Sequence, residues 1–232
     1  MTALSGGAPE ALLFDFGGTL DSDGVAWKDR FFPIWSEEVG SLEREKFDRA
    51  FYGSTDALVG AVPPTLPLSE TVDRIAAGVA SRLDAGHGAP SARAAARFTR
   101  ETLATLDRRI TWLSGLASRY RLAIVSNFYG NLAAVCEESG IAPHFSAAID
   151  STAVGCTKPG PAIFRAALDA LGASPDSAVF IGDSVPRDMS GARALGMRHV
   201  LLRPASSDGA PPCCCPDDPV IRRLEDLSEM LA

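Results

Sequence analysis

An apolar run leads directly into a carboxylate and two glycines in Ala11-Leu12-Leu13-Phe14-Asp15-Phe16-Gly17-Gly18-Thr19-Leu20. The run has the length and composition of a strand that is buried on both faces of a parallel sheet. Asp15 then lies at the carboxyl end of that strand, where a carboxylate can act as a nucleophile. The glycines allow the backbone to come close to a ligand. The segment therefore predicts a reactive carboxylate at the edge of a sheet.

Further apolar runs of strand length follow along the chain, at 122–126, 145–149, 178–181 and 199–202. Most of them are apolar throughout rather than alternating, which is typical of parallel strands covered on both faces. Helical patterns with proline near the start or glycine just past the end lie between them, at 132–140, 161–172 and 190–196. This alternation predicts an α/β fold with a doubly wound, Rossmann-like parallel sheet.

The segment 25–109 does not follow this rhythm, because it holds no clear buried strand and many helix-forming residues. Helical patterns cover 42–51, 69–83 and 91–106, and stretches rich in proline or glycine separate them. We therefore expect a core formed by residues 1–22 and 110–232, with a helical insertion at 23–109. Its aromatic residues could form the core of the insertion or line a pocket: Trp27, Phe31, Phe32, Trp35, Phe51 and Tyr52.

Composition excludes several classes of protein. The chain has 232 residues, 46% of them hydrophobic and 22% charged, and a net charge of -7, which argues against a nucleic-acid partner. No apolar run has the length of a membrane span, and residues 1–9 lack the pattern of a secretory signal. We expect a cytoplasmic monomer or homodimer that acts on a small molecule. The five cysteines do not form a disulfide framework, and Cys213–Cys215 are expected in an exposed, proline-rich loop.

Polar side chains also follow other strands of the expected sheet. Ser126 and Asn127 end the second strand, Asp183 ends the fourth, and Asp188 comes soon after it. Lys158 precedes the helix that leads into the fourth strand. Because the carboxyl ends of parallel strands meet at one edge, we expect these groups to converge on Asp15. Carboxylates so close together need a cation, and a set of oxygen ligands suits Mg²⁺.

In order and spacing, these residues resemble the haloacid dehalogenase superfamily of hydrolases. The shared motifs are Asp-x-x-Gly-Thr-Leu, a Ser-Asn after the second strand, a Lys-Pro, and Gly-Asp-x-x-x-x-Asp, spread over 10–22 and 110–232. The helical insertion resembles the cap of the superfamily's first structural subclass, which closes over the substrate and sets specificity. The resemblance implies hydrolysis through a covalent aspartyl intermediate.

The resemblance also implies a role for each motif residue. The catalytic residues would be Asp15 as nucleophile, Ser126 as a donor to the transferred group, and Lys158 as the cation that neutralises its charge. Substrate contacts would come from Gly18, Thr19 and Asn127. The metal would be held by Asp15, Asp183 and Asp188 with the backbone carbonyl of Gly17. Each residue also has a plainer alternative, as a helix cap or a turn former.

Gly17 departs from the pattern of the superfamily's phosphatases. Those enzymes carry a second aspartate here, which protonates the leaving alcohol and later activates water. A positioned acid or base is worth about 10²- to 10⁴-fold in rate. We predict that metal binding is kept and that acid–base catalysis from this position is lost. By position alone, candidate substitutes are Asp21, Asp23, Glu45 and Asp48.

Several functions are compatible with these residues, and a Mg²⁺-dependent phosphatase acting on a small phosphorylated metabolite is the preferred one. A 2-haloacid dehalogenase needs no proton for its leaving halide, but it uses no metal; Arg44 or Arg49 would have to bind the halide. Phosphonate cleavage would need Lys28 or Lys46 to form an imine. A catalytically impaired binding protein is the last alternative, and the presence of every other motif residue argues against it.

Overall fold

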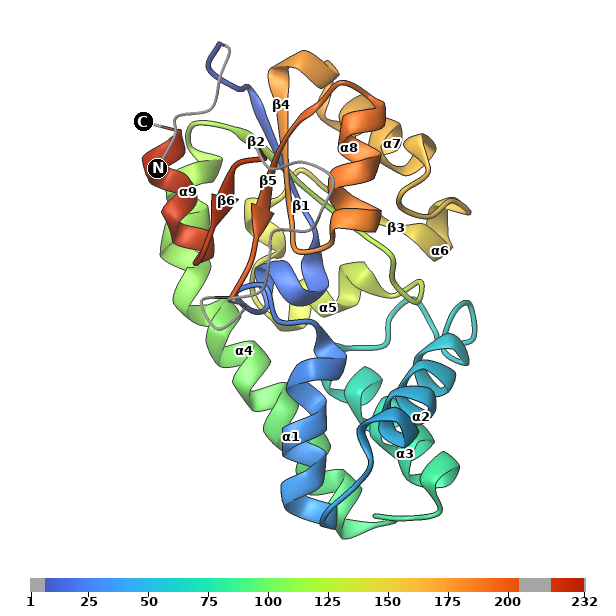
Figure 1. Cartoon of the computed structure of the whole chain (residues 1–232). Coiled ribbons are helices and arrows are strands. Elements are labelled where there is room, and N and C mark those ends of the chain that lie inside the picture. Colours follow the sequence, from blue (N-terminus) through green and yellow to red (C-terminus); the bar gives the residue numbers. More distant parts are fainter. Residues whose placement is uncertain (1–6, 205–217, 232) are drawn as a thin grey trace.

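The computed structural model describes residues 7–204 and 218–231. At its centre is a six-stranded parallel sheet with the strand order β3-β2-β1-β4-β5-β6. In chain order the strands are β1 (Ala11–Phe14), β2 (Arg121–Ser126), β3 (Ala147–Asp150), β4 (Ala178–Gly182), β5 (Arg198–Leu202) and β6 (Val220–Ile221). Helices lie on both sides of this sheet (Figure 1). The predicted doubly wound α/β fold is confirmed.

The central strand β1 is buried on both faces, which explains its uninterrupted apolar sequence. Leu12 pairs with Leu122 of β2 on one side and with Val179 of β4 on the other. Leu12 and Phe14 pack into the cluster that includes α5 (Leu132–Glu138) and the end of α4 (Ala89–Ala117). Leu13 packs on the opposite face, against α7 (Pro161–Leu171) and α8 (Ser190–Ala194).

Short elements complete the core. The remaining α-helices are α6 (Ser151–Val154) and α9 (Leu227–Met230), and 3₁₀ turns cover Ala142–His144, Pro175–Ser177 and Leu224–Asp226. Two tight helical turns, Phe16–Leu20 and Val185–Met189, follow β1 and β4. Both turns lie at the carboxyl ends of neighbouring strands, which is the edge where the sequence predicts a site.

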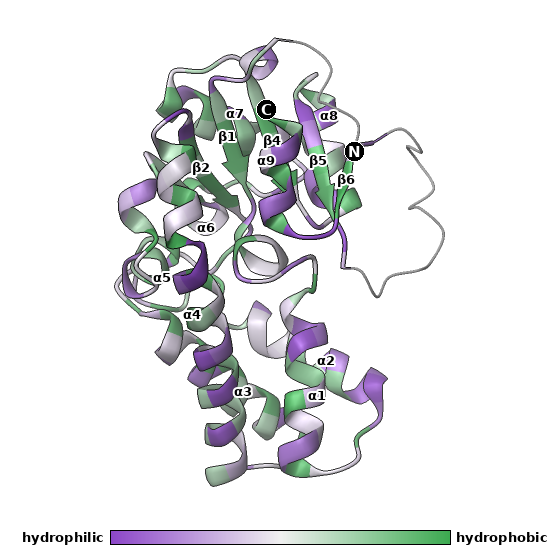
Figure 2. Ribbon diagram, turned by 90° about the vertical axis from the view of Figure 1, so that its left-hand side faces the viewer, coloured by the Kyte–Doolittle hydropathy of each residue, from purple (hydrophilic) through white to green (hydrophobic). Residues whose placement is uncertain are grey.

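The segment between β1 and β2 consists of helices and the loops that join them, with no strand among its described residues, as expected. It comprises α1 (Trp27–Val39), α2 (Arg44–Asp56), α3 (Leu68–Leu83) and the first part of α4, which form a separate layer beyond the sheet (Figures 1 and 2). Buried aromatic rings fill its centre, where Phe31 lies 5.2 Å from Phe98 and 6.0 Å from Trp35 between ring centroids. Most of the aromatic residues of this segment therefore belong to its core.

Two features of the helical layer differ from the sequence analysis. Helix α1 is not among the helical patterns of the sequence analysis, and Pro33 inside it removes a backbone donor. Burial of Phe31, Ile34 and Trp35 on one face of α1 outweighs that penalty. Helix α4 runs unbroken from the layer to the sheet, so it crosses the boundary expected after residue 109 without a linker.

The described part of the chain contains no helix that is long and apolar enough to cross a membrane. Cys136 and Cys156 are free thiols. The run Cys213–Cys215 lies outside the described residues.

Candidate active site

Asp15 lies at the carboxyl end of β1, and two glycines allow other groups to approach it. A Cβ atom at position 18 would lie 2.4 Å from Oδ2 of Asp183, and Gly18 has a φ of +94°. A Cβ atom at position 182 would lie 2.4 Å from Oδ2 of Asp188. Only glycine fits at these two positions, because any side chain would displace an aspartate from the site.

A buried lysine joins Asp15 to the rest of the site. Nζ of Lys158 donates to Oδ1 of Asp15 at 2.6 Å and lies 2.7 Å from Oδ1 of Asp188. Burial works against the charge on Lys158, but the carboxylates of Asp15 and Asp188 outweigh it and raise the pKa of Lys158. Oγ of Ser126 donates to the same oxygen of Asp15 at 3.0 Å. The structure thus brings together the three residues that the sequence predicts as catalytic.

Asn127 holds the backbone of Lys158 through both ends of its side-chain amide. Its Oδ1 accepts a hydrogen bond from the Lys158 amide at 2.8 Å, and its Nδ2 donates to the Lys158 carbonyl at 3.1 Å. Asn127 also lines the cavity beside Asp15. Its amide therefore positions the lysine loop, a role that the sequence analysis did not assign.

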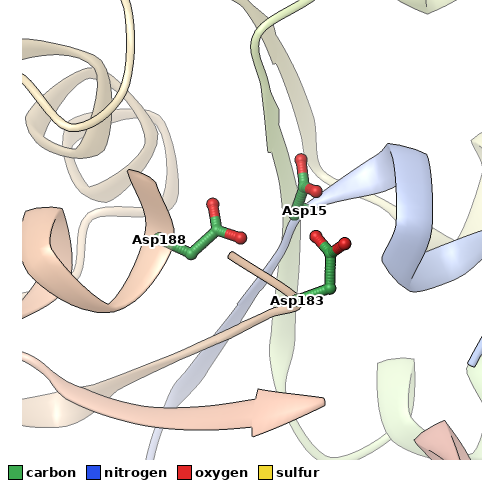
Figure 3. A group of neighbouring side chains, drawn as sticks. All are labelled: Asp15, Asp183 and Asp188. Atoms are coloured by element: carbon green, nitrogen blue, oxygen red, sulfur yellow. The ribbon is translucent and has the colours of Figure 1, made fainter. Parts of the chain in front are cut away.

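Three carboxylates converge at the edge of the sheet. Asp15, Asp183 and Asp188 each offer an oxygen, and these oxygens lie within 4.8 Å of one another (Figure 3). Burial and the neighbouring carboxylates raise the pKa of Asp183 well above its ordinary range, and burial also raises that of Asp188. Oδ1 of Asp183 is buried and accepts no hydrogen bond from the described residues. A buried, crowded set of oxygen ligands with an unpaired atom fits a divalent cation such as Mg²⁺.

An aromatic ring lies close to Gly17. A Cβ atom at position 17 would lie 3.3 Å from Nε1 of Trp27, the first residue of α1. This nitrogen donates to Oδ2 of Asp21 at 2.5 Å, and Asp21 also accepts from the Gly18 amide and from Arg30. Asp21 is fully buried, and that burial raises its pKa despite Arg30. Asp21 is absent from the lining of the cavity beside Asp15, so it is not placed to act as a substitute acid there.

The other candidate substitutes are also engaged elsewhere. Asp23 forms an ion pair with Arg109, Glu45 lies 4.0 Å from Arg49, and Asp48 pairs with Lys28 and Arg44. These three acidic residues do not line the cavity that contains Asp15. None of the four acidic residues that position alone suggests as substitutes therefore lies at this cavity.

A cavity of about 640 Å³ opens beside Asp15, Ser126 and Lys158. Its walls come from the start of α1, the end of α2 and the loops after β2 and β3. Five of its lining residues are aromatic: Trp27, Phe51, Tyr52, Phe128 and Tyr129. Lys28, Asp56 and Arg187 add charged groups. The cavity lies between the sheet and the helical layer, so residues of both form it.

A model of the haloacid dehalogenase-like hydrolases matches residues 9–196, which is most of the chain. The chain belongs to this family. The hydrolase is 29% identical over 199 residues to a phosphoglycolate phosphatase of Rhodospirillum rubrum, covering 84% of this chain and 79% of the relative. It is 41% identical over 97 residues to the bovine haloacid dehalogenase-like hydrolase domain-containing protein 3, and the match spans 39% of each chain.

Solved structures have the same fold at low sequence identity. A Bacillus subtilis hydrolase of this family, YfnB, solved with bound magnesium, aligns with a TM-score of 0.58 and 19% identity, covering 97% of this chain and 99% of that one. A dehalogenase solved as an intermediate complex aligns with a TM-score of 0.64 and 19% identity, covering 97% of this chain and 98% of that one. Both structures support the fold, and neither decides between phosphate and halide chemistry.

Arg109 is a site residue that the sequence analysis missed. It lies on α4, it is buried, and its Nη1 donates to the carbonyls of Thr19, Leu20 and Ser22 at 3.0, 2.5 and 3.0 Å. It also forms ion pairs with Asp23 and Glu225. Arg109 therefore fixes the loop that follows Asp15. No local motif marks it, because its contacts lie about 90 residues away in the chain.

Gly18 and Thr19 contribute to this loop and not to the wall of the cavity. The Gly18 amide donates to Asp21 at 2.7 Å. The Thr19 hydroxyl is buried without a hydrogen-bond partner among the described residues, while its carbonyl accepts from Arg109. The loop is thus held through backbone carbonyls and not through the threonine hydroxyl. Neither residue lines the cavity beside Asp15.

We expect Gly17→Asp to lower the free energy of unfolding by about 1 kcal/mol, because the new side chain crowds the Trp27 indole, which must shift slightly to admit it. Gly115→Asp on α4 is the matched control, because a Cβ atom there would contact nothing within 4 Å. Urea denaturation measures both variants. Equal unfolding free energies for the two would contradict the close packing of Trp27 against Gly17.

Proposed function

We propose that this hydrolase cleaves phosphate monoesters of small metabolites with Mg²⁺ bound, through a covalent intermediate on Asp15. The observation that carries the proposal is the cluster of Asp15, Asp183 and Asp188, with an unpaired buried oxygen on Asp183. Displacement of a halide needs no cation, whereas a phosphoryl group brings negative charge that must be neutralised. The R. rubrum relative, named a phosphoglycolate phosphatase, supports a phosphorylated small molecule.

The contacts of Asp15 suit it to nucleophilic attack. Ser126 and Lys158 both donate to Oδ1, which leaves Oδ2 to form a bond to phosphorus. The P–O ester bond breaks as this bond forms, and its electron pair leaves with the alcohol oxygen. Water then attacks the aspartyl phosphate, which releases inorganic phosphate and returns an electron pair to Asp15. Because position 17 carries no side chain, solvent must supply and remove the protons.

The cation would be held by Asp15, Asp183 and Asp188, with the Gly17 carbonyl as the expected fourth protein ligand. When bound, Mg²⁺ would neutralise the phosphoryl oxygens and hold them in place for attack. Lys158 contributes a second positive charge, because its two carboxylate partners keep its amine protonated. Without the cation, these carboxylates would repel an anionic substrate.

Halide displacement is the alternative that Gly17 favours, because a halide leaves without a proton. The two arginines that the sequence analysis proposed as halide ligands do not lie at the cavity. Arg44 pairs with Asp29 and Asp48, Arg49 is exposed near Glu45, and neither lines the cavity. Phosphoryl hydrolysis therefore has more support from this site.

Phosphonate cleavage requires a neutral lysine that can form an imine. Lys28 does line the cavity, but it lies 3.0 Å from Asp48 and 3.4 Å from Asp29. Partial burial works against its charge, yet the hydrogen bond from Lys28 to Asp48 outweighs this effect and raises the pKa of Lys28. Lys46 pairs with Glu43 on an exposed surface. A lysine held in its protonated form is a poor nucleophile, which argues against this chemistry.

Metal removal tests the proposal. We expect hydrolysis of 4-nitrophenyl phosphate to fall about 10²-fold or more on dialysis against EDTA, and to return with added Mg²⁺. Asp183→Asn should lose this response to metal. Asp169→Asn, an exposed aspartate on α7, is the control for loss of a carboxylate. Turnover that is unchanged by EDTA, or EDTA-resistant chloride release from 2-chloropropionate, would contradict the proposal. No turnover of any phosphate ester would favour a catalytically impaired protein.

A further inference from the structure

Two features of the cavity beside Asp15 constrain the group that the enzyme releases. Position 17 carries no acid, and the Trp27 indole beside it gives its N–H to Asp21. Aromatic rings continue from Trp27 along the cavity wall. We infer that the substrate is a phosphate monoester of an aromatic hydroxyl, an inference that rests on the phosphatase activity proposed above.

The first feature is the lack of an acidic side chain at position 17, beside the attacking carboxylate. Lys28 and Lys158 line the cavity, but their ammonium groups already contact the carboxylates of Asp48 and Asp15. Burial and the charge of Asp56 raise the pKa of Tyr129, so its phenol is a weaker acid than an ordinary tyrosine. Asp56 itself is exposed at the end of α2. An alcohol that leaves from this site therefore departs largely as its anion.

This condition separates two classes of phosphate ester. A phenol has a pKa of about 10, whereas water, a guide to alkyl alcohols, has a pKa of about 15.7. A phenolate can leave without protonation, but an alkoxide needs an acid that normally supplies about 10²- to 10⁴-fold in rate. This site lacks the acid but has the nucleophile Asp15, Lys158 and the other carboxylates. It is therefore suited to phosphate esters of phenols.

The second feature is the shape and chemistry of the wall. The rings of Trp27 and Phe128 lie 5.9 Å apart and those of Phe128 and Tyr129 lie 4.7 Å apart, between centroids. Tyr52 of α2 also lines the cavity, although 53% of it is exposed. Val59, at 54% exposure, is a further apolar lining residue. Half of the large, exposed hydrophobic residues in the described chain thus lie at this one cavity, where a flat aromatic group can pack against them.

The reaction balances without an added acid. Oδ2 of Asp15 forms a bond to phosphorus, the bond from phosphorus to the aryl oxygen breaks, and the phenolate departs with the electron pair. It takes a proton from water after release. Water then adds to phosphorus, the bond to Asp15 breaks, and phosphate leaves as the proton of the attacking water passes to solvent.

The first test compares leaving groups on the purified, Mg²⁺-loaded enzyme. We expect kcat/KM for ring-substituted phenyl phosphates to fall steeply as the pKa of the phenol rises. Cyclohexyl phosphate, which matches phenyl phosphate in size, should be hydrolysed at least about 10²-fold more slowly. Acetyl phosphate serves as an activated substrate without a ring. If cyclohexyl and phenyl phosphate react at equal rates and acetyl phosphate is also hydrolysed, the inference of an aromatic substrate is wrong. The proposed phosphatase activity would still stand.

The second test addresses the aromatic wall. Tyr52→Ala should lower the ratio of kcat/KM for phenyl phosphate to that for acetyl phosphate about 10-fold, mainly through KM, and Tyr52→Phe should keep the ratio. Val154→Ala is the control, because Val154 is 42% exposed but does not line the cavity. A ratio unchanged in Tyr52→Ala would overturn the role of the wall. Failure to hydrolyse even acetyl phosphate would overturn the phosphatase proposal and this inference with it.

Discussion

Asp15→Asn is expected to reduce hydrolysis of 4-nitrophenyl phosphate by roughly 10⁴-fold or more, because the carboxylate that attacks phosphorus is replaced by a neutral amide. The change keeps the size of the side chain, and Ser126 and Lys158 still have an oxygen to bind. Steady-state rates at saturating Mg²⁺ measure the effect, with Asp169→Asn as the control. Residual activity above about one hundredth of the wild type would contradict the role of Asp15.

The stability of the same variant distinguishes loss of chemistry from loss of fold. Three carboxylates lie together at this edge of the sheet, and the buried Lys158 pairs with two of them, Asp15 and Asp188. Removing one of them relieves repulsion in the metal-free protein, while Lys158 keeps Asp188 as a partner. The metal-free variant should therefore unfold at the same temperature as the wild type or at a higher one. A clear fall in the unfolding temperature would show that Asp15 is needed for the fold.

Arg109→Met is expected to lower the free energy of unfolding by about 3 to 5 kcal/mol. The change leaves three buried carbonyls of residues 19 to 22 without their donor, and it leaves Asp23 and Glu225 without a cation. Urea denaturation measures the loss. Because the loop after Asp15 depends on these contacts, kcat should also fall in the fraction that folds.

Arg108→Met is the matched control for this prediction. Arg108 is the neighbour of Arg109 on α4, but it is exposed and donates to the Thr105 hydroxyl at 3.1 Å. Its loss should change the unfolding free energy by less than about 0.5 kcal/mol. The loss of unfolding free energy in Arg109→Lys should lie between the losses in Arg108→Met and Arg109→Met, because one ammonium cannot replace the several donors of a guanidinium. Equal effects of Arg108→Met and Arg109→Met would contradict the role of Arg109.

The sheet and the side chains gathered at its edge could be predicted because their signals are local. An apolar run of four to six residues identifies each main strand, and the residue that follows the run lies at the edge of the sheet. Asp15, Ser126 and Asp183 are found in this way, and Lys158 is found from its place before a helix. Parallel pairing then brings them together, since carboxyl ends of parallel strands meet at one edge.

The parts that could not be predicted depend on contacts between distant segments. Trp27 lies against Gly17 because α1 packs beside the loop after β1. The sequence pattern of α1 is weak, because it contains Pro33. Arg109 supports a loop far from it in the sequence, and nothing near Arg109 indicates this. The two-residue strand β6 is too short to leave a recognisable pattern. Packing, which sequence periodicity does not report, decides these features.

The central claim is that Asp15 carries the phosphoryl group during turnover while no side chain at position 17 assists the attack of water. The second step should then be slow, and a phosphoenzyme should accumulate. Mixing the Mg²⁺-loaded enzyme with 4-nitrophenyl phosphate, quenching in acid and mapping the phosphate by peptide mass spectrometry tests this directly. The account predicts a phosphate on Asp15 that hydroxylamine releases and that Asp15→Asn lacks. Continued turnover with no phosphate on Asp15, in an enzyme that tolerates Asp15→Asn, would contradict it.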